Sequence, residues 1–189
     1  FATNRLGIFN QGYQNVAVSK SGEILVVWLS RTADGNHTGM WAQWFSPQGE
    51  PIGGNLLLRS SDAQYYYPLV ASGAHGGVLV LWSETRQTQE ADWSVLIGGE
   101  LLPDGSWSLP PRYLTSLGGL GVRFASPLPQ GGYAITLLGF RPNRTEDRTF
   151  LVLVDKDLKV IRGPSRVHAT PRSIQEVGGL AVSPSGEFL

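Results

Sequence analysis

The sequence predicts an all-β protein: a β-propeller, or a fragment of one, made of four-stranded antiparallel blades. Two observations lead to this fold class. The chain repeats itself at an offset of 54 residues, which places Val16 on Val70 and Trp28 on Trp82. Each repeat also contains four short strand patterns separated by turns and polar loops, with no convincing helical period. Repeats of this length with four strands each are typical of propeller blades, whereas a solenoid rung is normally shorter.

The elements follow one order in every repeat. A short strand, at 16–19 in the first copy, leads into a tight turn with glycine, "KSGE". The second strand is a nearly unbroken apolar run, which indicates burial on both faces. A polar loop, an aromatic third strand and a second tight turn follow, and the fourth strand, such as 55–58, is the least regular. The expected second strands are 24–28, 78–82 and 133–138, and the expected third strands are 40–45, 93–97 and 150–154.

Two further copies complete the pattern. The third is "VRFASPLPQGGYAITL", in which Ala125 matches Ala71 and the turn is shifted by one residue. The fourth is the final segment "GLAVSPSGEFL", in which Ala181 matches Ala17. We therefore expect one incomplete propeller-type domain over 1–189, which pairs with another copy or with the rest of a longer chain to close its ring. The expected blades are 14–60, 67–116 and 121–167, with orphan strands at 1–9 and 177–189.

The composition excludes several classes of function. The 15 basic and 15 acidic residues cancel, so no overall field attracts nucleic acid or an anionic membrane. The chain has no cysteine, and His37, His75 and His168 lie in different repeats, so we expect no metal site. No cofactor fingerprint occurs, and we expect no cofactor. No apolar run approaches the roughly 18 residues that a membrane span needs, so we expect no membrane insertion.

One segment resembles a known family of repeats. The stretch Trp41-Ala42-Gln43-Trp44-Phe45, followed by Gly49-Glu50-Pro51-Ile52-Gly53-Gly54, is similar to the "YAQRF…GNPVGG" pattern that follows a "VVVW" strand. That pattern marks repeats in large bacterial secreted and cell-surface proteins. The match is clear in the first repeat and fades in the second and third. The resemblance implies a propeller-like β architecture and an extracellular or cell-surface location, and it brings no catalytic residues.

The variable polar material of each repeat is expected at one end of the blades. Alternate connections of a four-stranded blade lie at opposite ends, so the tight turns share one end and the long loops share the other. We call the latter end the long-loop face. Loops on a rigid scaffold are where binding usually occurs. The long-loop face comprises the loops 31–38, 84–92 and 141–148 and the links 10–14, 60–66, 115–121 and 170–176.

Two features of the long-loop face suggest ligand binding. Tyr65 and Tyr66 combine an apolar ring with a polar tip, which suits sugar or peptide contacts; alternatively they only cover a blade junction. Arginines recur in the loops, and together they suit carboxylate or phosphate groups; alternatively they pair with acidic neighbours. The candidate ligand-binding residues are Tyr65, Tyr66, Arg31, Arg86, Arg141 (or Arg144 in its place) and Glu84.

Three functions remain open. The first is a non-catalytic binding module that recognises a glycan or a protein partner through the long-loop face. The second is a structural spacer with no specific ligand. The third is part of a propeller glycoside hydrolase, for which Glu84, Asp92 and Glu146 would supply an acid and a base. The segments expected to face the central channel, "VAVS", "VASG", "FASP" and "AVSP", are small and apolar, which counts against catalysis.

Overall fold

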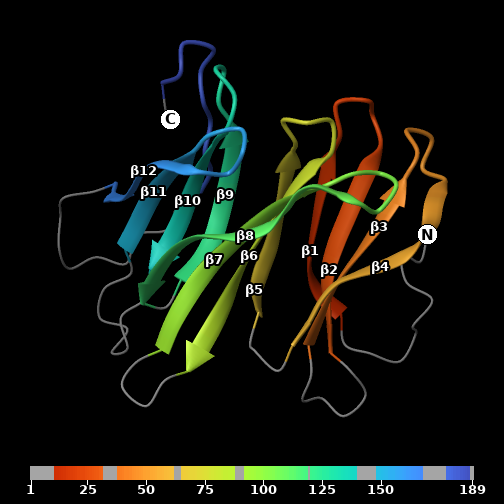
Figure 1. Ribbon diagram of the computed structural model, residues 1–189, viewed down its shortest axis with the longest axis horizontal. Coiled ribbons are helices and arrows are strands. Elements are labelled where there is room, and N and C mark those ends of the chain that lie inside the picture. Colours follow the sequence, from red (N-terminus) through yellow and green to blue (C-terminus); the bar gives the residue numbers. More distant parts are fainter. Residues whose placement is uncertain are drawn as a thin grey trace.

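The described part of the protein is an all-β propeller-type structure with three complete blades. A computed structural model describes residues 11–31, 38–61, 65–87, 92–118, 120–139, 148–167 and 178–187. Within these residues twelve strands form three four-stranded antiparallel sheets, one for each complete repeat, and no helix is present. The three sheets stand side by side in chain order (Figure 1). Among the described residues no helix is long and apolar enough to cross a membrane.

Each blade is a meander of four consecutive strands. The first blade has the order β1(Gln11–Val18), β2(Ile24–Arg31), β3(Thr38–Phe45) and β4(Pro51–Ser61). The second has β5(Tyr65–Ser72), β6(Val78–Gln87), β7(Asp92–Leu101) and β8(Trp107–Gly118). The third has β9(Leu120–Pro127), β10(Tyr133–Gly139), β11(Arg148–Val154) and β12(Val160–Arg166). These strands contain the strand patterns expected from the sequence, except that β1 ends at Val18 and leaves out the last residue of the expected strand 16–19.

The first strands of neighbouring blades lie next to one another. β1 contacts β5, and β5 contacts β9, as expected for the innermost strands of a propeller. Each of these strands carries an irregularity in its pairing with the second strand, and the three irregularities fall between Gly12 and Asn15, between Tyr66 and Leu69, and between Val122 and Phe124. Such bulges sharpen the local twist of a strand.

The hairpins inside the blades close through similar tight turns. In the first blade, the backbone N–H of Ser19 donates to the Glu23 carbonyl at 2.8 Å, and that of Gly22 donates to the Ser19 carbonyl at 3.2 Å. Gly22 has φ +99°, in the left-handed region that a side chain rarely adopts. Ser46 begins a turn with the same two hydrogen bonds between β3 and β4. The turns thus lie at the end of the blades opposite the long-loop face (Figure 1).

The described C-terminal segment repeats the first of these turns. The N–H of Ser183 donates to the Glu187 carbonyl at 2.8 Å, and Gly186 has φ +88°. The structure assigns a single bridge residue, Val182, and no strand within 178–187. The expected orphan hairpin is therefore represented here by its turn. The expected strand at 1–9 lies outside the described residues.

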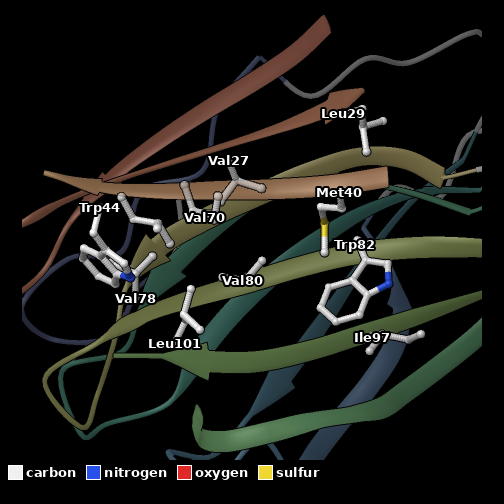
Figure 2. Packing of buried hydrophobic residues seen from close by; sticks show 12 residues of the cluster. Val27, Leu29, Met40, Trp44, Val70, Val78, Val80, Trp82, Ile97 and Leu101 are labelled. Atoms are coloured by element: carbon white, nitrogen blue, oxygen red, sulfur yellow. The ribbon is translucent and has the colours of Figure 1, made fainter. Parts of the chain in front are cut away.

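Two apolar layers hold the three blades together. Side chains alternate between the two faces of a strand, so each blade has one face toward the preceding blade and one toward the following blade. Between the first and second blades, Val27 and Leu29 pack with Val78, Val80 and Trp82 (Figure 2). The second layer lies between the second and third blades and contains Leu79, Leu81, Leu96, Tyr133, Ile135 and Leu137. Trp28 and Trp82 are both buried, as the repeat predicts.

The register of the third blade corrects one detail of the sequence alignment. Ala17 pairs with Leu25, and Ala71 pairs with the equivalent Leu79. In β9, however, it is Ser126 that lies opposite the equivalent Ala134, while Ala125 lies opposite Ile135. The match of Ala125 with Ala71 is therefore wrong by one residue. Because the side-chain period of a strand is two, this shift puts Ala125 on the other face of its blade.

Candidate functional site

The strand register brings most of the predicted binding residues to one end of two neighbouring blades. Arg31 ends β2, and Arg86 lies next to the last residue of β6. Tyr65 and Tyr66 begin β5, where they pair with Glu84 and Ser83. All of these positions are at the long-loop face of the first and second blades. Arg141 and Arg144 lie outside the described residues, as do most of the long loops.

Glu84 is the predicted site residue whose side chain the structure describes. It is 3% exposed and lies near the end of β6. Its Oε1 accepts a hydrogen bond from Arg59 Nε at 2.9 Å and another from Trp82 Nε1 at 3.0 Å. Arg59 Nη2 lies 3.4 Å from Oε2, so the guanidinium spans both carboxylate oxygens. A carboxylate taken out of water needs such partners, and here they come from two different blades.

The sequence interpretation missed Arg59. This residue is on β4 of the first blade, and its side chain is 45% exposed while its guanidinium holds Glu84. The signal was present in the sequence as Trp82-Ser83-Glu84, because an acidic residue that follows a buried apolar run requires a cationic partner. Which cation supplies it depends on how the blades stack, and that is a property of the fold.

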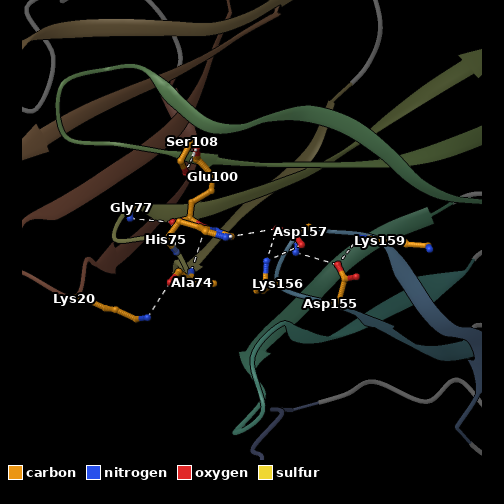
Figure 3. Close-up of polar contacts among 10 residues, drawn as sticks. All are labelled: Lys20, Ala74, His75, Gly77, Glu100, Ser108, Asp155, Lys156, Asp157 and Lys159. Carbon is orange, nitrogen blue, oxygen red and sulfur yellow. Dashed lines mark hydrogen bonds and ion pairs between the residues drawn. The ribbon is translucent and has the colours of Figure 1, made fainter.

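A second buried carboxylate lies at the opposite end of the blades. Glu100, on β7, is fully buried and accepts three backbone hydrogen bonds from the turn between β5 and β6. The donors are Ala74 N at 3.1 Å, His75 N at 2.7 Å and Gly77 N at 3.0 Å. His75 Nδ1 also lies 3.0 Å from Oε2 (Figure 3). The convergence of backbone N–H groups makes a concavity suited to an anion, and Glu100 fills it.

This Glu100 cluster links all three blades. Lys20 of the first blade donates to the Ala74 carbonyl at 2.9 Å. His75 Nε2 lies 3.6 Å from Asp157 Oδ1 in the third blade (Figure 3). A short chain of polar contacts therefore crosses both blade interfaces at the turn end. Its buried member has every oxygen engaged, so the cluster serves the structure and offers no vacant acceptor to a ligand.

The electrostatic environment perturbs several groups around these turns. Burial raises the pKa of the Tyr133 phenol, and the neighbouring Glu100 carboxylate raises it further. Hydrogen bonds from Ser19 and then Ser21 lower the pKa of Glu23, which is exposed. The Ser106 hydroxyl and backbone N–H lower the pKa of Asp104 in the same way. These shifts stem from turn hydrogen bonds and from burial, and they do not mark a catalytic acid or base.

The three carboxylates considered for glycoside hydrolysis do not form a described pair. Glu84 is held by Arg59 and Trp82. Asp92 begins β7, and only its backbone is described, while Glu146 lies outside the described residues. Within the described part of the chain no group of three or more His, Asp or Glu side chains is arranged to hold a metal ion. His37 and His168 lie outside that part, and His75 belongs to the Glu100 cluster.

Comparison with solved structures finds the same kind of fold in an endo-arabinase from Bacteroides thetaiotaomicron VPI-5482. The TM-score is 0.62 at 12% sequence identity, over 100% of this chain and 72% of the endo-arabinase chain. At this identity the likeness shows the fold alone. No family model matches the chain, and no curated protein matches it.

Proposed function

We propose that this chain is a non-catalytic binding module that recognises a glycan through the long-loop face of its first and second blades. The observation that carries the proposal is the meeting of three residue types at one blade junction. Arg59 is fixed there by Glu84, and the register places Tyr65 directly opposite Glu84. In the proposal the guanidinium held by Glu84 supplies hydrogen bonds, and the tyrosines at the start of β5 supply a stacking surface.

A difference between the two ends of the blades supports this proposal. At the turn end, the buried Glu100 is saturated by backbone N–H groups and His75. At the long-loop face, the Arg59 side chain that binds Glu84 is 45% exposed. In the proposal Glu84 orients Arg59, and direct contact of Glu84 with the ligand stays a prediction. A secreted or cell-surface location accompanies the proposal, because the first repeat resembles repeats of such proteins.

A glycoside hydrolase is the second candidate, and the likeness to an endo-arabinase is the observation that favours it. Hydrolysis needs two carboxyl groups at the scissile bond, about 5–9.5 Å apart. Glu84 already carries two donors, which would have to be displaced before it acts as an acid or a base. A binding module does not require the two donors to leave Glu84. A structural spacer without a ligand is the third candidate, and it predicts no binding at all.

One screen separates the three candidates. A glycan array that includes neutral and acidic polysaccharides, arabinan among them, is probed with the wild-type chain, and the best glycan is incubated with the protein while new reducing ends are measured. The binding module predicts retention on the array without new reducing ends. Release of reducing ends would establish a hydrolase. Retention of no glycan would contradict the proposal, and binding of an acidic peptide in its place would move the function to protein recognition.

A further inference from the structure

The turn between β11 and β12 contains a leucine where the turn between β1 and β2 has a glycine. The backbone N–H of Asp155 donates to the Lys159 carbonyl at 2.9 Å, and that of Leu158 donates to the Asp155 carbonyl at 3.0 Å, as in the turn that begins at Ser19. Leu158 has φ +60°, in the left-handed region that Gly22 occupies in the earlier turn. A residue with a Cβ adopts this conformation at a cost in free energy, so contacts outside the turn must offset that cost.

Two contacts join this turn of the third blade to the second blade. Leu158 is 1% exposed and belongs to the apolar layer between the two blades. Beside it, Asp157 Oδ1 lies 3.6 Å from Nε2 of His75, which is on the turn between β5 and β6 (Figure 3). The leucine contact is apolar and does not change with pH. The contact with the histidine depends on whether the imidazole ring carries one proton or two.

The two ring nitrogens of His75 lie near two different carboxylates. Nδ1 is 3.0 Å from Glu100 Oε2, and Nε2 is the atom near Asp157. A neutral imidazole has one N–H, and an ionised carboxylate can only accept hydrogen bonds. The shorter contact, with the buried Glu100, takes this N–H, so in the neutral ring Nε2 presents a lone pair to Asp157. A second proton, on Nε2, turns the same contact into an attraction between opposite charges.

The other charges around this contact stay constant while a histidine titrates. Lys156 Nζ donates to Asp157 Oδ2 at 2.8 Å, and this hydrogen bond lowers the pKa of the Asp157 carboxyl, which therefore keeps its charge in mild acid. Besides Glu100, the other charged or titratable groups near the contact within the described residues are Lys20, Arg112, Tyr133, Asp155 and Lys159. Histidine is the residue type among them that ordinarily changes its charge between pH of about 5 and 8.

We propose that the contact between His75 and Asp157 is a pH-sensitive switch that docks the β11–β12 turn of the third blade on the second blade. In mild acid the imidazolium attracts Asp157 and holds the strained turn against its neighbour. As the pH rises through the titration of the histidine, this attraction is lost, and the burial of Leu158 holds the turn. Since the second proton binds more strongly beside Asp157 than in the unfolded chain, the contribution to stability is present in acid and decreases as the pH rises. The switch lies at the turn end and is independent of glycan binding.

The test is a double-mutant cycle of His75→Gln and Asp157→Asn, with melting temperatures measured in mild acid and in mild alkali, at pH of about 5.5 and 8. In acid, the double variant should lose about 2 °C less than the sum of the two single losses, because the two side chains interact. In alkali the losses should add. The control cycle replaces Asp157→Asn with Asp104→Asn. Asp104 holds the same position in the turn between β7 and β8, where it accepts hydrogen bonds from Ser106, and its losses should add at both pH values.

A second measurement uses the wild type and does not depend on the folding of a variant. The ring nitrogens of His75 and the backbone amide of Leu158 are followed by NMR between pH of about 5 and 8. Nδ1 should keep its proton while Nε2 loses its proton, and the Leu158 amide should shift with the same midpoint, whereas the amide of Gly105 in the equivalent turn should not. Additive losses in acid, or a coupling of equal size at both pH values, would overturn the proposal. So would a Leu158 amide that does not follow the histidine.

Discussion

Arg59 and Glu84 lie 25 positions apart in the sequence and join the first two blades through an Nε–Oε1 contact of 2.9 Å. Glu84 comes from the second strand of one blade, and Arg59 comes from the outermost strand of the other. The contact therefore does two things. It satisfies a buried carboxylate at a blade interface, and it fixes an arginine at the long-loop face where the ligand is proposed to bind.

The first prediction concerns this pair. Glu84→Gln should lower the free energy of unfolding by about 2 kcal/mol, because it weakens a charge-assisted hydrogen bond in a buried place. Arg59→Met should cost about 1 kcal/mol, since the half-exposed guanidinium is partly screened by water. The double variant should cost less than the sum of the two, as expected for residues in direct contact. Additive losses in a denaturant-unfolding cycle would show that the two side chains do not interact in solution.

Substitution of Glu100 should cause a larger loss of stability than substitution of Glu84 or Arg59. Glu100→Gln replaces one carboxylate oxygen with an NH₂ group that faces the backbone N–H of Ala74, so a donor meets a donor in a buried place. We expect unfolding to become easier by about 3 kcal/mol. Glu50→Gln is the control, because Glu50 is exposed in the turn between β3 and β4, and it should change stability by no more than about 0.5 kcal/mol. Equal effects of the two substitutions would contradict the role given to Glu100.

The raised pKa of Tyr133 predicts that the protein loses stability in alkali. The pKa of its phenol is raised in the folded state by burial and by Glu100, while in the unfolded chain it returns to about 10. Above that pH the unfolded chain releases the proton and the folded chain keeps it. The stabilisation is therefore complete below pH of about 10 and decreases as the pH rises further. Tyr133→Phe should flatten this dependence in unfolding experiments between neutral and alkaline pH, and parallel curves for the two proteins would refute the assignment.

Two glycines distinguish the effect of backbone conformation from the effect of the space available to a side chain. Neither Gly49 nor Gly54 has any atom near the position of an added Cβ, but only Gly49 has a left-handed backbone, with φ +87°. Gly49→Ala should therefore cost about 1 kcal/mol through its conformation alone. Gly54→Ala should be neutral or slightly stabilising, since alanine restricts the unfolded chain more than glycine does. The melting temperatures of the two variants provide the comparison, and a larger loss for Gly54→Ala would contradict the described turn.

Much of the fold could be predicted because the repeat is carried by local signals. Buried runs such as the one ending at Trp82 and turn glycines such as Gly22 appear at one spacing, and each sets its strand or turn locally. The register of β9 could not be read in the same way. One extra residue before the third hairpin can be aligned on either side of Ala125, and the pairing with β10 decides between the two.

The site was less predictable, for a different physical reason. Tyr65 and Glu84 were placed at the same end of a blade from the strand order alone. The partner of Glu84 comes from another blade, and the distance between two blades is not encoded in the spacing of either repeat. The same holds for Glu100, whose sequence context, "IGGEL", looks like any strand. The structural role of Glu100 depends on three backbone N–H groups of the neighbouring hairpin.

The central claim is that a glycan binds at the long-loop face, and its most direct test compares two tyrosine positions. The affinity for the best glycan from the array is measured by calorimetry for the wild type, for Tyr66→Ala and for Tyr113→Ala. Tyr113 lies on the outer strand of the second blade and is largely exposed, so it controls for the loss of an aromatic ring. The proposal predicts that Tyr66→Ala weakens binding about tenfold, or about 1.4 kcal/mol, at an unchanged melting temperature, while Tyr113→Ala binds like the wild type. Wild-type affinity in Tyr66→Ala together with a lowered melting temperature would contradict it and leave that tyrosine as a cover for the blade junction.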